Sequence, residues 1–159
     1  MRLSTRGRYA VMAMVELAAR ERCGDCDARQ RRSVSLAEIA GAQALSIAYL
    51  EQLFGPLRRA GLVASARGPG GGYRLARPSE AIAIADIIAA VDESIRATRC
   101  EEGSPGCVAG QRCLTHDLWA ELGEQIRLFL THLTLADVVE GCCGGRAVPP
   151  HPRVSRAAE

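Results

Sequence analysis

Three cysteines and a histidine lie close together near residue 110 of this 159-residue chain. Cys100, Cys107, Cys113 and His116 are separated by six, five and two residues in the segment RCEEGSPGCVAGQRCLTHDLW. The residues between them include glycine and proline, which allow a loop to wrap around an ion. Thiolates and imidazole bind zinc and iron, and four such ligands complete one metal centre. The segment therefore predicts a metal site.

Two kinds of centre fit this spacing: a tetrahedral zinc site and an iron–sulfur cluster with three thiolates and one imidazole. The alternative is a set of unligated thiols, which is disfavoured because free cysteine usually occupies a buried core rather than a loop. Cys113 and His116 stand three apart at an expected helix start, so both side chains project to one side. The positive end of that helix favours bound thiolates.

The other four of the seven cysteines form two short pairs. Cys23 and Cys26 make a CxxC in a polar segment, but no βαβ pattern surrounds it, which disfavours a thioredoxin-like enzyme. We expect solvent-exposed loop thiols there, with a zinc site or a redox pair as alternatives. Cys142 and Cys143 fall in a Gly- and Pro-rich tail and are expected to be incidental. His132 and His151 are interpreted as ordinary surface groups.

The first half of the chain predicts a helix-turn-helix. A first helix begins at Ser4 or Thr5 and continues to about Arg20, and a capping box of Ser35 and Glu38 opens a short second helix to about Gln43. A third helix follows Ser46. Its expected inner face is Ile47, Leu50, Leu53, Phe54 and Leu57, and its outer face is Ala48, Glu51, Gln52, Arg58 and Arg59.

A β-hairpin is predicted directly after these helices, because GLVASARGPGGGYRLARP has the pattern strand, tight turn, strand. Helix-turn-helix and hairpin together make a winged helix. The turn has no Gly-Lys-Ser/Thr ending of a P-loop, and its flanking Arg67, Arg74 and Arg77 could enter a DNA groove. The simpler interpretation is a connecting turn. The expected DNA-binding residues are Ala48, Glu51, Gln52, Arg58, Arg59, Arg67, Gly70, Gly71 and Tyr73.

The second half predicts a helix over AIAIADIIAAVDE, the cysteine segment, and a long helix from about Leu114 to Leu130. A near-heptad series on the long helix indicates pairing with a second copy of the chain; packing on its own domain is the alternative. The expected dimerisation residues are Leu118, Leu122, Ile126, Phe129 and Leu133. The expected fold class is mainly α with a small β-hairpin, divided into a DNA-binding domain (1–80), a cluster-binding and dimerisation segment (81–140) and a disordered tail (141–159).

Charge is distributed unevenly. Residues 1–80 hold thirteen Arg against seven Asp and Glu, whereas residues 81–159 hold seven against eleven. The basic half is the one expected to meet a polyanion such as DNA. No apolar run is long enough to span a bilayer, so a cytoplasmic location is expected. No pattern of nucleophile, base and cleft indicates an enzyme.

Several motifs together resemble the winged-helix regulators that sense iron–sulfur clusters, over about residues 1–140: MRLSTRGRYAVMAM, LSIAYLEQLFGPLRRAGLV, RGPGGGY, AVDES with ATRC, and CLTHDLW. The resemblance implies a homodimeric repressor, with activation at some promoters, that controls cluster-biogenesis genes and receives its cluster from donor proteins. It implies a [2Fe–2S] cluster on Cys100, Cys107, Cys113 and His116. It also implies DNA contacts by Glu51, Gln52 and Arg67, with Glu51 selecting against wrong sites.

Two departures from that pattern are visible: the first ligand gap is one residue longer than the family suggests, and CGDCDARQRR looks like an insertion. The sequence leaves three rival classes open. A structural zinc protein would use the same four ligands as a brace, and a nitric-oxide- or redox-responsive regulator would keep the winged helix. A thiol oxidoreductase would depend on Cys23 and Cys26.

Overall fold

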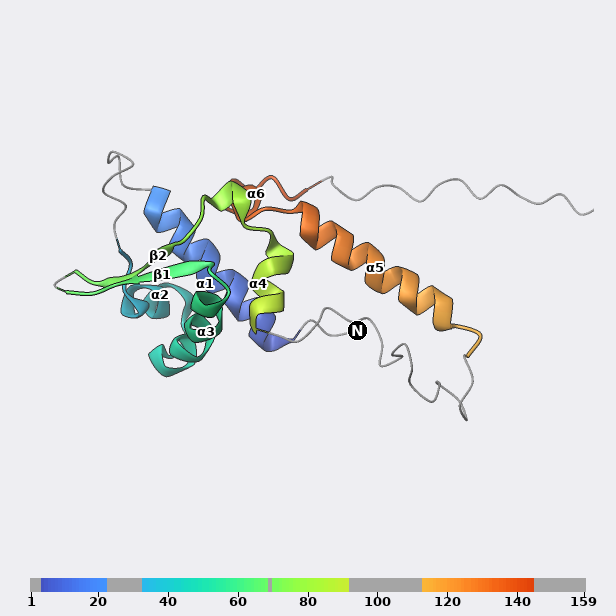
Figure 1. Cartoon of the computed structure of the whole chain (residues 1–159), viewed down its shortest axis with the longest axis horizontal. Helices are drawn as coiled ribbons and strands as arrows, with labels where there is room; N and C mark the ends of the chain where they lie inside the picture. The colour runs from blue at the N-terminus through green and yellow to red at the C-terminus, as the bar shows by residue number, and fades with distance from the viewer. Residues whose placement is uncertain (1–3, 23–32, 69, 92–112, 145–159) are drawn as a thin grey trace, which may run out of the picture.

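The computed structural model describes residues 4–22, 33–68, 70–91 and 113–144 (Figure 1). The elements in order are α1 (Thr5–Arg22), α2 (Leu36–Gln43), α3 (Ile47–Arg59), β1 (Val63–Ala66), β2 (Gly72–Leu75), a short 3₁₀ turn η1 (Ser79–Ala81), α4 (Ile84–Val91), α5 (His116–His132) and α6 (Leu135–Val139). The predicted class, mainly helical with one small hairpin, is confirmed.

Local capping explains where α2 and α3 begin. The Ser35 hydroxyl accepts a hydrogen bond from the Glu38 N–H at 3.2 Å, and the Glu38 carboxylate accepts from the Ser35 N–H at 2.9 Å, which completes the predicted capping box. Ser46 caps α3 through the Tyr49 N–H at 3.2 Å. Ala44 ends α2 with a left-handed backbone (φ 52°), and this residue turns the chain between the two helices.

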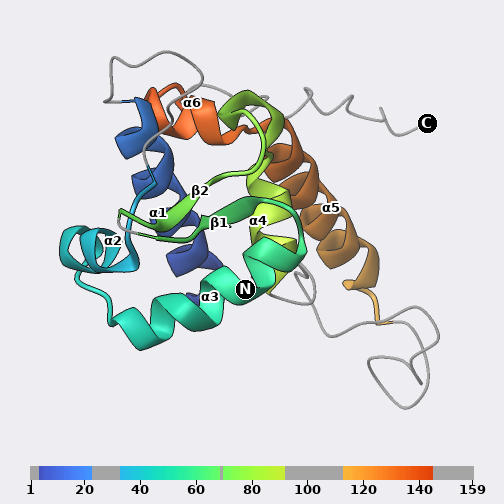
Figure 2. The same cartoon turned by 60° about the vertical axis from the view of Figure 1, so that its left-hand side comes forward.

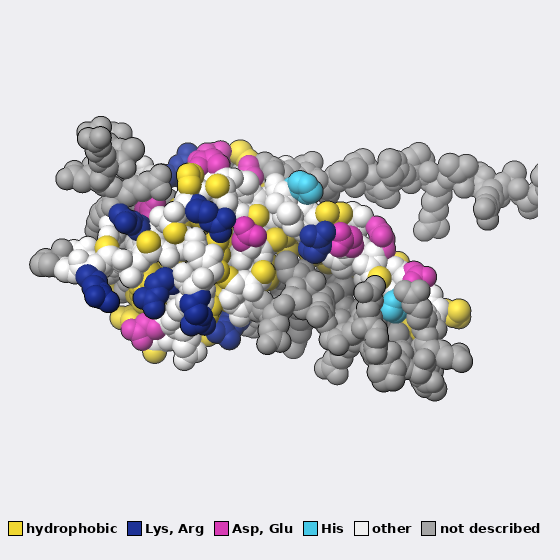
Figure 3. Space-filling model, viewed as in Figure 1, with side chains coloured by type: hydrophobic (Ala, Val, Ile, Leu, Met, Phe, Trp, Pro, Cys, Tyr) yellow, Lys and Arg dark blue, Asp and Glu magenta, His cyan; other side chains and the backbone are white. Residues whose placement is uncertain are grey.

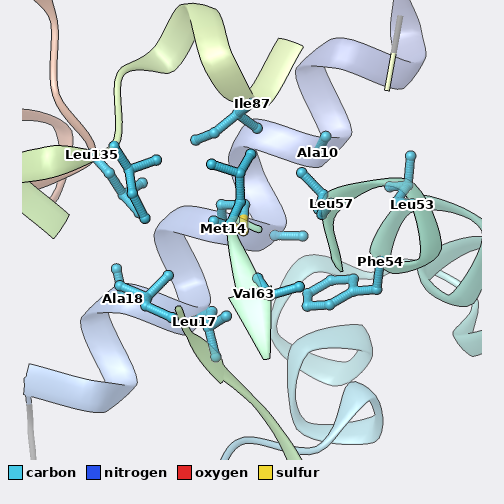
Figure 4. Packing of buried hydrophobic residues seen from close by; sticks show 14 of the residues in the cluster. Ala10, Met14, Leu17, Ala18, Leu53, Phe54, Leu57, Val63, Ile87 and Leu135 are labelled. Carbon is cyan, nitrogen blue, oxygen red and sulfur yellow. The ribbon is translucent and has the colours of Figure 1, made fainter. Parts of the chain in front are cut away.

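A single core joins elements from both halves of the chain (Figure 4). Met14 and Leu17 of α1, Leu53 and Phe54 of α3, and Ile87 of α4 are all fully buried. Figure 2 shows α1 running through the middle of the body, with the hairpin, α3 and α4 around it. Burial of such side chains is worth roughly 1.5–3 kcal/mol each, so this core is the main stabilising feature.

The hairpin is held on both edges of β2. β1 and β2 pair antiparallel, with Val63 opposite Leu75. On the other edge, Val34 and Tyr73 exchange two backbone hydrogen bonds, each 2.8 Å long, and the Glu21 carboxylate accepts from the Leu75 N–H. These contacts satisfy backbone groups that a two-stranded ribbon would leave unpaired.

The C-terminal elements differ from the sequence prediction. α5 begins at His116 and ends at His132, about two residues later at each end than predicted. Leu133 follows with an extended backbone (φ −98°, ψ 118°). Its carbonyl accepts a hydrogen bond from the Ile84 N–H, and its side chain is only 6% exposed because it packs in the core of its own chain. Leu133 therefore does not continue the exposed series predicted for dimerisation. A capping box of Thr134 and Asp137 starts α6, which the sequence reasoning missed.

The body also includes part of the segment expected to be tail. Cys143 packs against the core and Gly141 adopts a positive φ just after α6. Among the described residues, no helix is both long enough and apolar enough to cross a membrane.

Candidate nucleic-acid interface and cysteine–histidine site

Helix α3 has one buried face and one exposed face, as the sequence predicted, with one exception. Leu50, Leu53, Phe54 and Leu57 are fully buried, whereas Ile47 at the first position of the helix is 47% exposed. The outward positions are all exposed: Ala48, Glu51, Gln52, Arg58 and Arg59. A helix anchored by one apolar face and free on the other can enter a DNA groove. Base contact by these five residues stays a prediction.

The hairpin turn presents Arg67 and Gly70 to solvent. Gly71 is half-buried, and a Cβ there would lie 2.7 Å from the Ala66 carbonyl oxygen, so the turn requires glycine at that position. Tyr73 has a different environment. Its ring lies edge-on to Phe54 with centroids 4.7 Å apart, so Tyr73 joins the hairpin to α3. It is placed to position the wing.

Two further arginines near this surface were missed by the sequence reasoning. Arg6 at the start of α1 donates a hydrogen bond to the Gln52 carbonyl at 3.5 Å, which brings the N-terminal end of α1 beside the outer face of α3. Arg8 stacks on the Tyr9 ring at 5.2 Å, and Tyr9 contacts Tyr49 of α3 edge-on. The excess of arginine in the first half of the sequence is the feature from which Arg6 and Arg8 could have been proposed as part of this surface. Figure 3 shows Arg side chains gathered over the hairpin half of this face.

The predicted metal ligands fall partly within the described chain. Cys113 and His116 lie on one turn at the start of α5, where the His116 N–H donates to the Cys113 carbonyl at 3.0 Å. Both side chains are half-buried. The Cys113 sulfur is 3.5 Å from the Thr115 hydroxyl. Cys100 and Cys107 lie outside the described residues, and within the described ones no group of three possible metal ligands comes together.

This turn suits a soft or borderline metal centre. Its donors are a thiol and an imidazole that both remain partly accessible, at the positive end of a seventeen-residue helix. Three thiolates and one imidazole would complete either a zinc or an iron–sulfur site. The donor chemistry therefore fits both centres that the sequence left open.

Helix α5 presents an apolar surface. It contacts α4, yet none of residues 116–132 is buried. Leu118 is 61% exposed, Phe129 40% and Leu122 36%, and Ile126 is half-buried; these four residues are the α5 stripe. Trp119 beside it is 41% exposed. On the same helix Arg127 binds Glu124 through two hydrogen bonds of 2.8 and 2.6 Å, which lower the pKa of Glu124.

Within the described residues, Cys142, Cys143 and His132 do not belong to this turn. Cys142 is exposed, and the Cys143 thiol points toward the Asp137 carbonyl at 3.7 Å. An Arg22–Glu140 ion pair of 2.9 Å ties the end of α1 to the end of α6. His132 is exposed, with Nδ1 2.8 Å from the Leu128 carbonyl. Cys23, Cys26 and His151 lie outside the described residues.

Comparison with known proteins places these features in a family. Residues 3–141 match the Rrf2 model, described as an iron-dependent transcriptional regulator. The chain is 52% identical to the HTH-type transcriptional regulator IscR of Yersinia enterocolitica and 51% identical to that of Erwinia tasmaniensis, in each case over 87% of this chain and 79% of the relative. These relatives are named as regulators and not as enzymes, as expected for this chain.

Solved structures agree. CymR, the global cysteine regulator of B. subtilis, has a TM-score of 0.72 at 34% identity and covers 89% of this chain and 98% of its own. IscR of T. potens has a TM-score of 0.68 at 34% identity and covers 94% and 93%. The family resemblance seen in the sequence is thereby confirmed, with IscR proteins among the relatives. On its sequence, its winged helix and these relatives, the chain belongs to the Rrf2 family of DNA-binding transcriptional regulators.

Proposed function

We propose that this regulator is a homodimeric repressor that senses iron–sulfur status through a [2Fe–2S] cluster on Cys100, Cys107, Cys113 and His116. It would control genes for cluster biogenesis and activate some promoters. The observation that carries the proposal is the turn at the start of α5, where Cys113 and His116 are held together at a positive helix end. The fraction of the protein that carries a cluster would then depend on the cell's iron–sulfur supply. Donor proteins would deliver it in the cytoplasm.

DNA recognition is assigned to the outer face of α3 and the wing. Arg58 and Arg59 of α3 and Arg67 of the wing would contact phosphates or guanine edges, and Gln52 would read a base edge. The family resemblance gives Glu51 a selective role, because a carboxylate accepts a hydrogen bond from cytosine and repels phosphate. Ala48, Gly70 and Gly71 would allow close approach of the backbone.

A second copy of the chain is assigned to the α5 stripe. Four apolar side chains on one helix face are costly to leave in water, and two such faces can bury one another. The symmetric contact would place two recognition helices on one DNA duplex, as dimeric helix-turn-helix proteins require.

The route from cluster to DNA would run through α4. The segment that carries Cys100 and Cys107 connects α4 to α5 in the sequence. In turn, α4 packs against α1 and α3, and Ile87 of α4 is fully buried in the core beside them. Ligands within this connection and at the first residue of α5 would couple its arrangement to the spacing of the two recognition helices.

The test begins with protein purified without oxygen, in which iron, sulfide and zinc are counted per chain and the visible spectrum is recorded. The proposal expects equal iron and sulfide and a red-brown colour. DNA sequences are then selected from a random pool by loaded protein, apoprotein and Cys107→Ala protein. Loaded and apo forms should select different sequences, and the variant should select only the apo set.

Matched controls isolate the site. Cys142→Ala changes an exposed thiol outside the proposed ligand set and should keep wild-type iron, sulfide and DNA choice. Colourless protein that holds zinc at Cys113 and His116 and refuses cluster reconstitution would refute cluster sensing and leave a zinc-braced regulator. Identical DNA selection by loaded and apo protein would refute the coupling.

A further inference from the structure

Thr115 stands at the N-cap of α5 but does not cap it. Its backbone (φ −99°, ψ 5°) is outside the extended region that capping residues adopt, and within the described residues its hydroxyl makes no hydrogen bond to a helix N–H. The same chain shows the usual arrangement elsewhere. Ser35, Ser46 and Thr134 are all extended, and each hydroxyl accepts from a backbone N–H at 3.2 Å.

The Thr115 hydroxyl instead lies 3.5 Å from the Cys113 sulfur, within hydrogen-bond distance for sulfur. The turn that brings them together is closed by the His116 N–H, which donates to the Cys113 carbonyl at 3.0 Å. In a free thiol either atom could donate. A metal-bound thiolate has no proton, so the threonine O–H must then be the donor.

We infer that Thr115 is a positioning residue that donates a hydrogen bond to the Cys113 thiolate and thereby raises the reduction potential of the bound cluster. The inference rests on the proposed function. A hydrogen bond withdraws electron density from the sulfur and so stabilises the more negative, reduced state of an iron–sulfur centre. It also fixes the orientation of the sulfur relative to the neighbouring His116.

The experiment compares wild-type protein with Thr115→Val and Thr115→Ser, all purified and reconstituted without oxygen. Valine has the shape of threonine without the hydroxyl, and serine keeps the hydroxyl without the methyl group. Iron and sulfide per chain are counted first. The midpoint potential is then measured by titration with mediators, followed by the visible absorption of the cluster. Thermal unfolding of the three apoproteins reports any purely structural effect.

We expect all three proteins to bind the cluster. The reduction equilibrium of T115V should shift about tenfold toward the oxidised form, which for one electron is about 59 mV. T115S should stay within about twofold of wild type, or about 18 mV by the same relation. The apoproteins should unfold at similar temperatures, because the hydroxyl does not cap the helix.

Three results would overturn the inference. One is a T115V potential equal to that of wild type. Another is a T115S potential shifted as far as that of T115V, which would assign the effect to packing of the methyl group. The third is a wild-type protein that takes up no iron and sulfide. That result refutes the proposed function itself, and it is distinguished from the other two because it appears before any variant is compared.

Discussion

Replacing Gly72 with alanine would test how the wing is held to the body. A Cβ at residue 72 would lie 2.4 Å from the Val34 carbonyl oxygen and 2.6 Å from the Val34 carbonyl carbon. No real Cβ approaches backbone so closely, so one of the two chains must move. Val34 cannot move freely, because it exchanges two 2.8 Å hydrogen bonds with Tyr73 and its side chain is 1% exposed.

The expected loss in the free energy of unfolding follows from the contacts between β2 and Val34 that must be broken. Losing both Val34–Tyr73 hydrogen bonds costs about 1 kcal/mol each. Partial exposure of Val34 adds to this, since full burial of a valine is worth at least roughly 1.5 kcal/mol. Alanine also restricts the unfolded chain, which offsets roughly 0.4–1 kcal/mol. We therefore expect Gly72→Ala to lower the free energy of unfolding by about 2 kcal/mol.

Urea unfolding followed by circular dichroism, at one fixed protein concentration, measures this change. Gly41→Ala is the matched control, because Gly41 is in α2 and a Cβ there meets nothing within 4 Å. In a helix that substitution should raise the free energy of unfolding by roughly 0.5–1 kcal/mol. A G72A protein as stable as G41A would refute the packing of β2 against Val34.

Other predictions concern the outer surfaces and α6. Leu118→Glu with Leu122→Glu should convert the proposed dimer to a monomer in sedimentation velocity, and an unchanged dimer would refute the α5 stripe as its interface. Arg67→Ala should weaken DNA binding and reduce the salt-dependence slope by about 1 in anisotropy titrations, whereas Arg127→Ala should leave the slope unchanged. Leu135→Ala removes a fully buried side chain and should cost roughly 2–5 kcal/mol in urea unfolding; a cost below about 1 would mean that α6 is not part of the core.

Local patterns in the sequence were sufficient to predict the winged helix. A capping box needs only a serine and a glutamate three residues apart, as at Ser35 and Glu38, and an amphipathic helix needs only the period of its apolar residues. These interactions close within a few residues, so they do not depend on the rest of the chain. The inner face of α3, apart from Ile47, and the hairpin after it could therefore be predicted.

The metal site was predicted in a different way. The spacing of the three cysteines and the histidine in the sequence identified the candidate metal ligands. The turn that holds Cys113 and His116 together adds one observation in favour of a shared site. The contact of Thr115 with the Cys113 sulfur could not be foreseen. A threonine before a helix normally caps it, and only the backbone angles of this turn direct the hydroxyl elsewhere.

What only the tertiary structure decided is which distant segments meet. Val34 pairs with β2, and Glu21 accepts from the Leu75 N–H, 54 residues away in the chain. Leu133 carries the same apolar signal as Leu118, yet the helix ends before it and the Ile84 N–H draws it into the core. The periodic pattern in the sequence shows only that the side chain at a position is apolar. Which surface covers it depends on the backbone hydrogen bonds and neighbours that the whole fold supplies.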